Sequence, residues 1–209
     1  MAGIGRIKIL LLSAVLCLLV AQARAAVVFD SFGPGDSYNT GIGLTLGGPT
    51  SSLEWDSACP FIPSADCLVT SVTLPGWRWM GASSLVTVHL TTNVAMMPGV
   101  ILETSQVNIT SLTGEIVTAP FAGTTALSAG TMYWLWLSAE DDFAGAWPIN
   151  TISVLDGYCW DMAGSGNWVY MSVTESAAFR VEGVVPEPSS CALVVLGLAG
   201  VIARRKRVK

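Results

Sequence analysis

The chain has 209 residues, of which 52% are hydrophobic and 12% charged, and its net charge at pH 7 is −5. Residues 26–185 carry fourteen acids against only Arg78 and Arg180, so the middle of the chain has a net charge of −12. This acidic balance excludes nucleic acid and disfavours anionic membrane surfaces as partners, because phosphates are neutralised by lysine and arginine.

The N-terminus has the pattern of a secretory signal. Arg6 and Lys8 precede the apolar run 9–20, and Ala23 and Ala25 supply the small residues of a cleavage site. The apolar run is short for a membrane span, which disfavours an uncleaved anchor. We therefore expect residues 1–25 to form a signal helix that is removed.

The exported part begins with short strands separated by glycine-rich loops. Residues 27–33 form an apolar run that stops at the breaker cluster 33–36, and apolar residues alternate over 42–46. Both stretches indicate strands. Residues 26–184 have the length of one ordinary domain, and we expect a single domain there.

Residues 54–67 contain two prolines and two cysteines, and we expect them to form a loop. In an oxidising, exported context the loop would bring Cys59 and Cys67 together as a disulfide. Cys159 is then the odd thiol, and its bonding to either of the other two is the alternative.

Strand patterns are clearest from residue 68 onward. Residues 84–91 alternate, with Val86, Val88 and Leu90 on one face. Pro98-Gly99 indicates a turn, and the aromatic run 132–137, with Trp134 and Trp136, predicts a buried central strand. The remaining expected strands are 68–74, 100–109, 114–121, 152–155, 168–173 and 178–185.

About ten short strands without a convincing amphipathic helix predict an all-β fold. The spacing favours a single β-sandwich of jelly-roll type over residues 26–184. We expect this domain to be flanked by the N-terminal signal helix and a short C-terminal transmembrane helix.

His89 is the only histidine of the chain, and the alternation places it among threonines on the outward face of the strand 84–91. A serine triad or a zinc site would depend on this one residue, and no G-x-S-x-G elbow or paired ligand spacing accompanies it. We therefore predict no catalytic residue, no metal ligand and no cofactor.

Acidic side chains are grouped in three places and could supply the carboxylate pair of a glycosidase or a calcium site. Sequence separation does not say whether carboxyl groups from different loops meet, and solvated loops are the simpler interpretation. We do not predict a site from these groups, which are Glu54 with Asp56, Glu140 with Asp141 and Asp142, and Asp156 with Asp161.

All eight tryptophans lie in the exported part, and their ring faces could stack on sugars. Trp134 and Trp136 are interpreted as core residues. Trp77, Trp79 and Trp147 lie beside proline or glycine in expected loops, so they are the candidates for an exposed sugar platform.

The C-terminal stretch combines a strand breaker, an apolar run and a basic cluster. Pro186 and Pro188 end any regular element. The fifteen uncharged residues 189–203 would span about 22 Å as a helix, which is short of the ~30 Å hydrocarbon core. The basic cluster at 204–207 should stay on the cytoplasmic side.

Val185-Pro186-Glu187-Pro188, the apolar run and Arg204-Arg205-Lys206-Arg207 together resemble the PEP-CTERM sorting tail of Gram-negative surface proteins. The resemblance covers residues 185–209. It implies an inner-membrane intermediate, cleavage by an exosortase-type sorting enzyme, and delivery to the cell surface or matrix of bacteria that make extracellular polysaccharide. A plain C-terminal membrane anchor is the alternative.

A second resemblance covers most of residues 27–184. Pro98-Gly99, the stretch 127–134 with its Ala-Gly-Thr-x-Tyr-Trp pattern, a late Trp168 strand and Phe179-Arg180-Val181-Glu182-Gly183 are similar to the exported β domains called choice-of-anchor R. This resemblance implies no catalytic or ligand residues. The three cysteines of the domain lie outside its pattern.

Three classes of function follow. A non-enzymatic surface or extracellular-matrix protein, sorted by its tail and associated with extracellular polysaccharide, is our first hypothesis. A carbohydrate-binding module that uses Trp77, Trp79 and Trp147 is the alternative. A glycan-directed hydrolase ranks last, because the sequence displays no acid–base pair.

Overall fold

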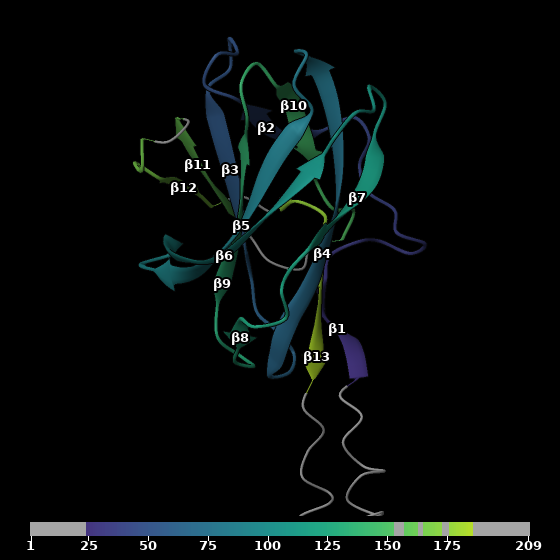
Figure 1. Ribbon diagram of the computed structural model, residues 1–209, viewed down its shortest axis with the longest axis vertical. Coiled ribbons are helices and arrows are strands. Elements are labelled where there is room, and N and C mark those ends of the chain that lie inside the picture. Colours follow the sequence, from purple (N-terminus) through teal and green to yellow (C-terminus); the bar gives the residue numbers. More distant parts are fainter. Residues whose placement is uncertain (1–23, 153–156, 163–164, 173–175, 186–209) are drawn as a thin grey trace, which may run out of the picture. The chain divides into compact units, whose positions relative to one another are not determined.

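A computed structural model describes residues 24–152, 157–162, 165–172 and 176–185, and the stretch Ala25–Val184 forms one compact unit. The fold of these residues is all-β (Figure 1). Its strands are β1 (Arg24–Asp30), β2 (Gly43–Gly47), β3 (Trp55–Phe61), β4 (Cys67–Met80), β5 (Leu85–Val94), β6 (Met97–Asn108), β7 (Glu115–Pro120), β8 (Ala126–Leu127), β9 (Tyr133–Ala139), β10 (Ala144–Pro148), β11 (Tyr158–Met162), β12 (Val169–Met171) and β13 (Arg180–Val185).

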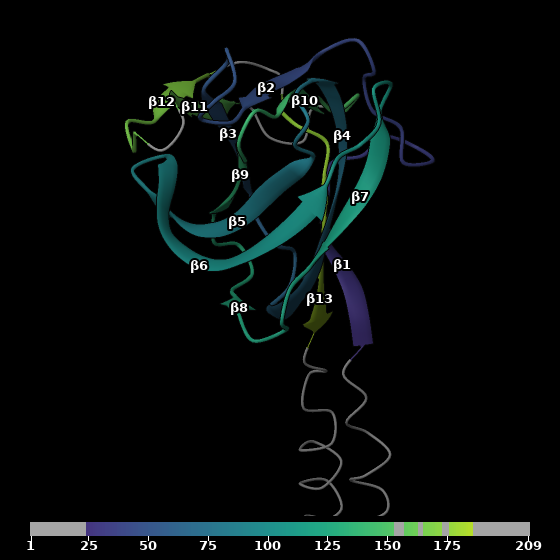
Figure 2. The same cartoon turned by 45° about the horizontal axis from the view of Figure 1, so that its top comes forward.

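The strands form one curled antiparallel sheet in the order β1-β13-β4-β10-β2-β3-β9-β5-β6 (Figure 2). β7 and β8 also pair with β4, and β11 joins β3 to β12. The long strand β4 connects the β1–β13 side of the sheet to the side that begins with β10. Its first part pairs with β13 and β7, and its last part pairs with β10. The expected all-β class is confirmed, whereas a two-sheet jelly roll is not shown.

The change of partner along β4 occurs at Pro75 and Gly76. A Cβ atom on Gly76 would lie 2.5 Å from Cδ1 of Ile109, so a larger residue here would have to displace that buried side chain. The strand was expected to end at residue 74, with Trp77 and Trp79 in a loop beside the proline and glycine. The proline and glycine are instead the place where the strand passes from one set of neighbours to another, and Trp77 and Trp79 lie within it.

The centre of the sheet follows the predicted pattern. β9 lies between β3 and β5, and its Trp134, Leu135 and Leu137 are fully buried, as expected for a central strand. In β5 the predicted face of Val86, Val88 and Leu90 is also fully buried. Burial of such apolar surface at about 25 cal/mol per Å² supplies most of the free energy that stabilises the fold.

The predicted loop 54–67 is wrong in its first half, which forms β3. Pro60 pairs with Trp134 of β9, so the proline lies inside a ladder. On the other edge of β3, β11 pairs only as far as Ala58. A proline is tolerated beyond that point because one edge of the strand needs no donor there.

The turn predicted at Pro98-Gly99 is also wrong. The hairpin between β5 and β6 turns at Ala95 and Met96, whose φ angles are 51° and 65°. Positive φ at both central residues is the signature of a type I′ turn, which normally uses Asn-Gly. Pro98 falls within β6, the last strand of the sheet, where its missing N–H is tolerated.

Both arginines of the unit Ala25–Val184 are held in place. Arg180 pairs with Asp30 and Asp36, and its guanidinium lies 5.5 Å from the centre of the Phe32 ring. Arg78 donates to the carbonyl oxygens of residues 81–83. Neither cation is therefore a free surface charge.

Several expectations lie outside the described residues. These are the signal helix apart from its last residues, the C-terminal helix, the strand at 152–155 beyond Ile152, and the sorting motif beyond Val185. Ala25, predicted at the signal cleavage site, lies in β1. Within the described ranges, no helix is long and apolar enough to cross a membrane.

Candidate functional site

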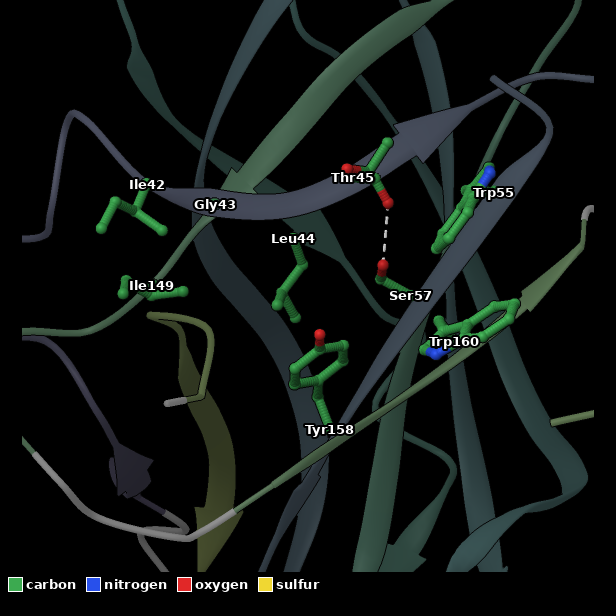
Figure 3. A pocket seen from close by; sticks show the side chains of 9 residues that line it. All are labelled: Ile42, Gly43, Leu44, Thr45, Trp55, Ser57, Ile149, Tyr158 and Trp160. Atoms are coloured by element: carbon green, nitrogen blue, oxygen red, sulfur yellow. Dashed lines mark hydrogen bonds between the residues drawn. The ribbon is translucent and has the colours of Figure 1, made fainter. Parts of the chain in front are cut away.

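A pocket of about 250 Å³ opens among β2, β3 and β11 (Figure 3). Its aromatic side is formed by Trp55, Tyr158 and Trp160. The other lining residues are Ile42, Gly43, Leu44, Thr45, Ser57 and Ile149. All nine residues are uncharged, although the domain around them is strongly acidic.

Strand geometry explains why the aromatic side chains gather. Tyr158 and Trp160 are two residues apart in β11, so they lie on the same face of the strand. Trp160 is opposite Ser57 in the register of β11 and β3, which makes it a diagonal neighbour of Trp55. The two indole rings stack with centroids 4.6 Å apart and an angle of 23° between their planes.

The polar groups of the pocket include the hydroxyls of Ser57 and Tyr158 and the backbone carbonyl of Thr45. The Oγ of Ser57 donates to the backbone carbonyl of Thr45 over 2.8 Å, and this bond ties β3 to β2 (Figure 3). The same oxygen keeps its lone pairs as acceptors. The hydroxyl end of Tyr158 is directed toward Leu44 (Figure 3). The pocket thus offers aromatic faces, aliphatic walls and a few hydroxyl groups.

The three tryptophans predicted as a sugar platform do not form one surface. Trp147 is fully buried in β10 and donates its Nε1–H to the carbonyl oxygen of Ala178 over 2.9 Å. Trp77 is also buried, in β4. Their expected placement in exposed loops is therefore wrong. Only Trp79 is exposed, with 44% of its surface accessible.

His89 is not the freely exposed strand residue that the sequence suggested. Its ring stacks on Trp136 with centroids 4.1 Å apart, and its Nε2 lies 2.8 Å from the Oγ of Ser138. Burial lowers the pKa of His89, although the nearby Glu140 acts in the opposite direction. Trp136 in turn contacts Trp168 edge to face. Histidine and tryptophans thus form a packed cluster.

Carboxylates considered for catalysis hold loops instead. Asp142 accepts from the backbone N–H groups of Ala82 and Ser83, which lowers its pKa. Asp161 accepts from the N–H groups of residues 166 and 167. Glu140 accepts from the hydroxyl of Thr87. In the part of the chain that the structure describes, no group of three or more metal-ligating side chains occurs.

The predicted disulfide is not formed, because Cys59, Cys67 and Cys159 are free and buried thiols in this structure. Cys59 lies in the ladder of β3 with β9, while Cys67 begins β4 and pairs with β8. The loop that would have joined them is thus largely strand. Burial raises the pKa of Cys59 and of Cys159 to about 12.

The sequence analysis missed Trp55, Tyr158 and Trp160 as site residues. A local signal existed, because Tyr158 and Trp160 alternate with Cys159 and Asp161 in the pattern of a strand with one aromatic face. The pairing of β11 with β3, which brings Trp55 to that face, had no local signal.

The described fold is an all-β unit, and its last strand, β13, ends where a second sequence feature begins. The family model of the PEP-CTERM protein-sorting motif matches residues 184–207. This match includes the predicted Val185-Pro186-Glu187-Pro188 and Arg204–Arg207. The motif implies an exported protein that an exosortase processes at the membrane. Comparison with curated proteins gives no match.

Proposed function

We propose that the chain is a non-enzymatic surface or extracellular-matrix protein that associates with extracellular polysaccharide. The observation that carries the proposal is the sorting motif at residues 184–207. In this scheme a signal peptide is removed near Ala25, and the chain pauses at the inner membrane with Arg204–Arg207 in the cytoplasm. Cleavage near Pro186-Glu187-Pro188 then delivers the acidic β domain to the cell surface or matrix of a Gram-negative bacterium.

The chemistry of the β domain supports a role without turnover. Asp142 accepts from two backbone N–H groups, which lower its pKa and favour a charged structural carboxylate over a general acid, and Asp161 is engaged in holding the loop at residues 165–167. The ring of His89 is covered by Trp136. A general base needs access to its substrate, so this packing argues against His89 in that role.

The sorting step is tested with an epitope tag inserted after Leu112, which lies in an exposed loop. The tagged chain is followed in source cells with and without the sorting enzyme. We expect an enzyme-dependent loss of the C-terminal mass, and we expect the triple change Pro186→Ala, Glu187→Ala and Pro188→Ala to block it. An intact C-terminus in every fraction would contradict sorting and leave a plain membrane anchor.

Polysaccharide association is tested separately on the purified full chain. The probe is the extracellular polysaccharide purified from the source cells, cast into a native gel. Retarded migration supports association, whereas migration equal to that in a gel without polysaccharide contradicts it. Because this readout does not depend on cleavage, sorting and association can fail independently.

A further inference from the structure

The pocket of Trp55, Tyr158 and Trp160 exposes more aromatic surface than the fold requires. Trp55 is 37% exposed, although an indole gains about 25 cal/mol for each Å² that it buries. Ile42, at the other end of the same pocket, is 51% exposed (Figure 3). Single exposed apolar residues are ordinary, but these two line one hollow that also contains Trp160. The arrangement is that of a preformed, mostly apolar site with a few polar groups.

Charge narrows the class of ligand. The nine lining residues are neutral, so the pocket offers an ion no direct partner. The surrounding domain has a net charge of −12 over residues 26–185, which repels anions such as phosphates and carboxylates. The ligand that fits is therefore neutral.

Shape and chemistry narrow the class further. The near-parallel Trp55 and Trp160 rings provide flat apolar surfaces on their outward faces, and beside them Ser57 provides a hydroxyl that is bonded to the backbone carbonyl of Thr45. A pyranose ring has the complementary chemistry, because its C–H groups form flat apolar faces and its hydroxyls project around the edge. The volume of about 250 Å³ lies below the roughly 300–1,000 Å³ of sites for drug-sized ligands, so it suits a single ring.

We infer that this pocket binds a neutral pyranose residue of an extracellular polysaccharide, stacked on the Trp55–Trp160 pair. The inference rests on the proposed association with polysaccharide and assigns it to a site distinct from the three tryptophans that the sequence suggested. One ring per domain gives weak binding by itself. Many copies on one surface would hold a repeating polymer through multivalency.

The test compares point variants of the full chain in gels that contain the purified polysaccharide. Trp55→Ala and Trp160→Ala remove the stacking faces, and Trp79→Ala is the matched control because Trp79 is an exposed tryptophan outside the pocket. We expect each pocket variant to bind at least tenfold more weakly, which corresponds to about 1.4 kcal/mol. The control should bind like the unchanged protein.

Thermal unfolding of each variant separates lost binding from lost folding. Trp160→Phe provides a second measure, because a smaller aromatic ring should restore part of the affinity if stacking is the cause. Equal retardation of the unchanged protein and both pocket variants would overturn the assignment while leaving polysaccharide association intact. Absence of retardation for the unchanged protein would overturn both proposals.

Discussion

The hairpin between β5 and β6 allows a sharp prediction, because removing a side chain there should stabilise the protein. Met96 has φ of 65° and its side chain is 42% exposed. The left-handed conformation costs a residue with a Cβ about 1–2 kcal/mol, and glycine avoids this cost. Glycine in turn loses about 0.5–1 kcal/mol through the greater freedom of the unfolded chain.

These two backbone effects together should raise the free energy of unfolding of Met96→Gly by up to about 1.5 kcal/mol. For a chain of this size that corresponds to an increase in Tm of up to about 6 °C. Urea unfolding followed by tryptophan fluorescence measures the change. Met80→Gly is the matched control, because Met80 is an exposed methionine in a regular strand. The control should lose about 0.5–1 kcal/mol. Equal destabilisation by both changes would refute the reasoning about the turn.

Three further predictions concern buried bonds, acid stability and thiols. Ser31→Ala should lower the free energy of unfolding by about 2 kcal/mol, measured in urea, because one buried hydroxyl serves both the N–H of Phe179 and the carbonyl of Ala177. The N–H groups bound to Asp142 lower its pKa below the ordinary 3.8, so its charge stabilises the fold above that value and the contribution is lost as the pH falls through the lowered pKa. Asp142→Asn should therefore flatten the decline of Tm in acid, and an unchanged decline would contradict this role. Peptide mapping after alkylation in denaturant should find separate modified thiols, and little reaction in the native protein at pH 8; a bridged peptide would contradict the structure at Cys59, Cys67 and Cys159.

Local patterns predicted the strands whose burial is regular along the chain. The alternation of β5 and the apolar run of β9 are visible because both strands keep the same neighbours along much of their length. β3 was missed because Pro60 indicates a loop unless the position of β11 is known. β10 was missed because its small residues Ala144, Gly145 and Ala146 carry no pattern, although all three are buried against β4 and β2.

The sequence predicted the residues of the candidate pocket less well than it predicted the strands. Neighbouring glycine or proline does not determine which way a tryptophan points, as the buried Trp147 and the exposed Trp79 demonstrate. Trp55 and Trp160 meet only through the register of β3 and β11, which depends on long-range pairing. The tail was predictable because its signal is a contiguous motif. The signal peptide and the resemblance to choice-of-anchor R domains stay predictions.

The engagement of both arginines has a consequence for copies of the domain that come close to one another. Arg180 is held by Asp30 and Asp36, and Arg78 is held by backbone carbonyls, so neither projects as a free cation toward a neighbouring copy. Neighbouring domains on a crowded surface should then repel over roughly the Debye length, about 8 Å at physiological ionic strength. The distance between neighbouring copies should shrink as the salt concentration rises. Divalent cations should hold neighbouring copies together by bridging their carboxylates.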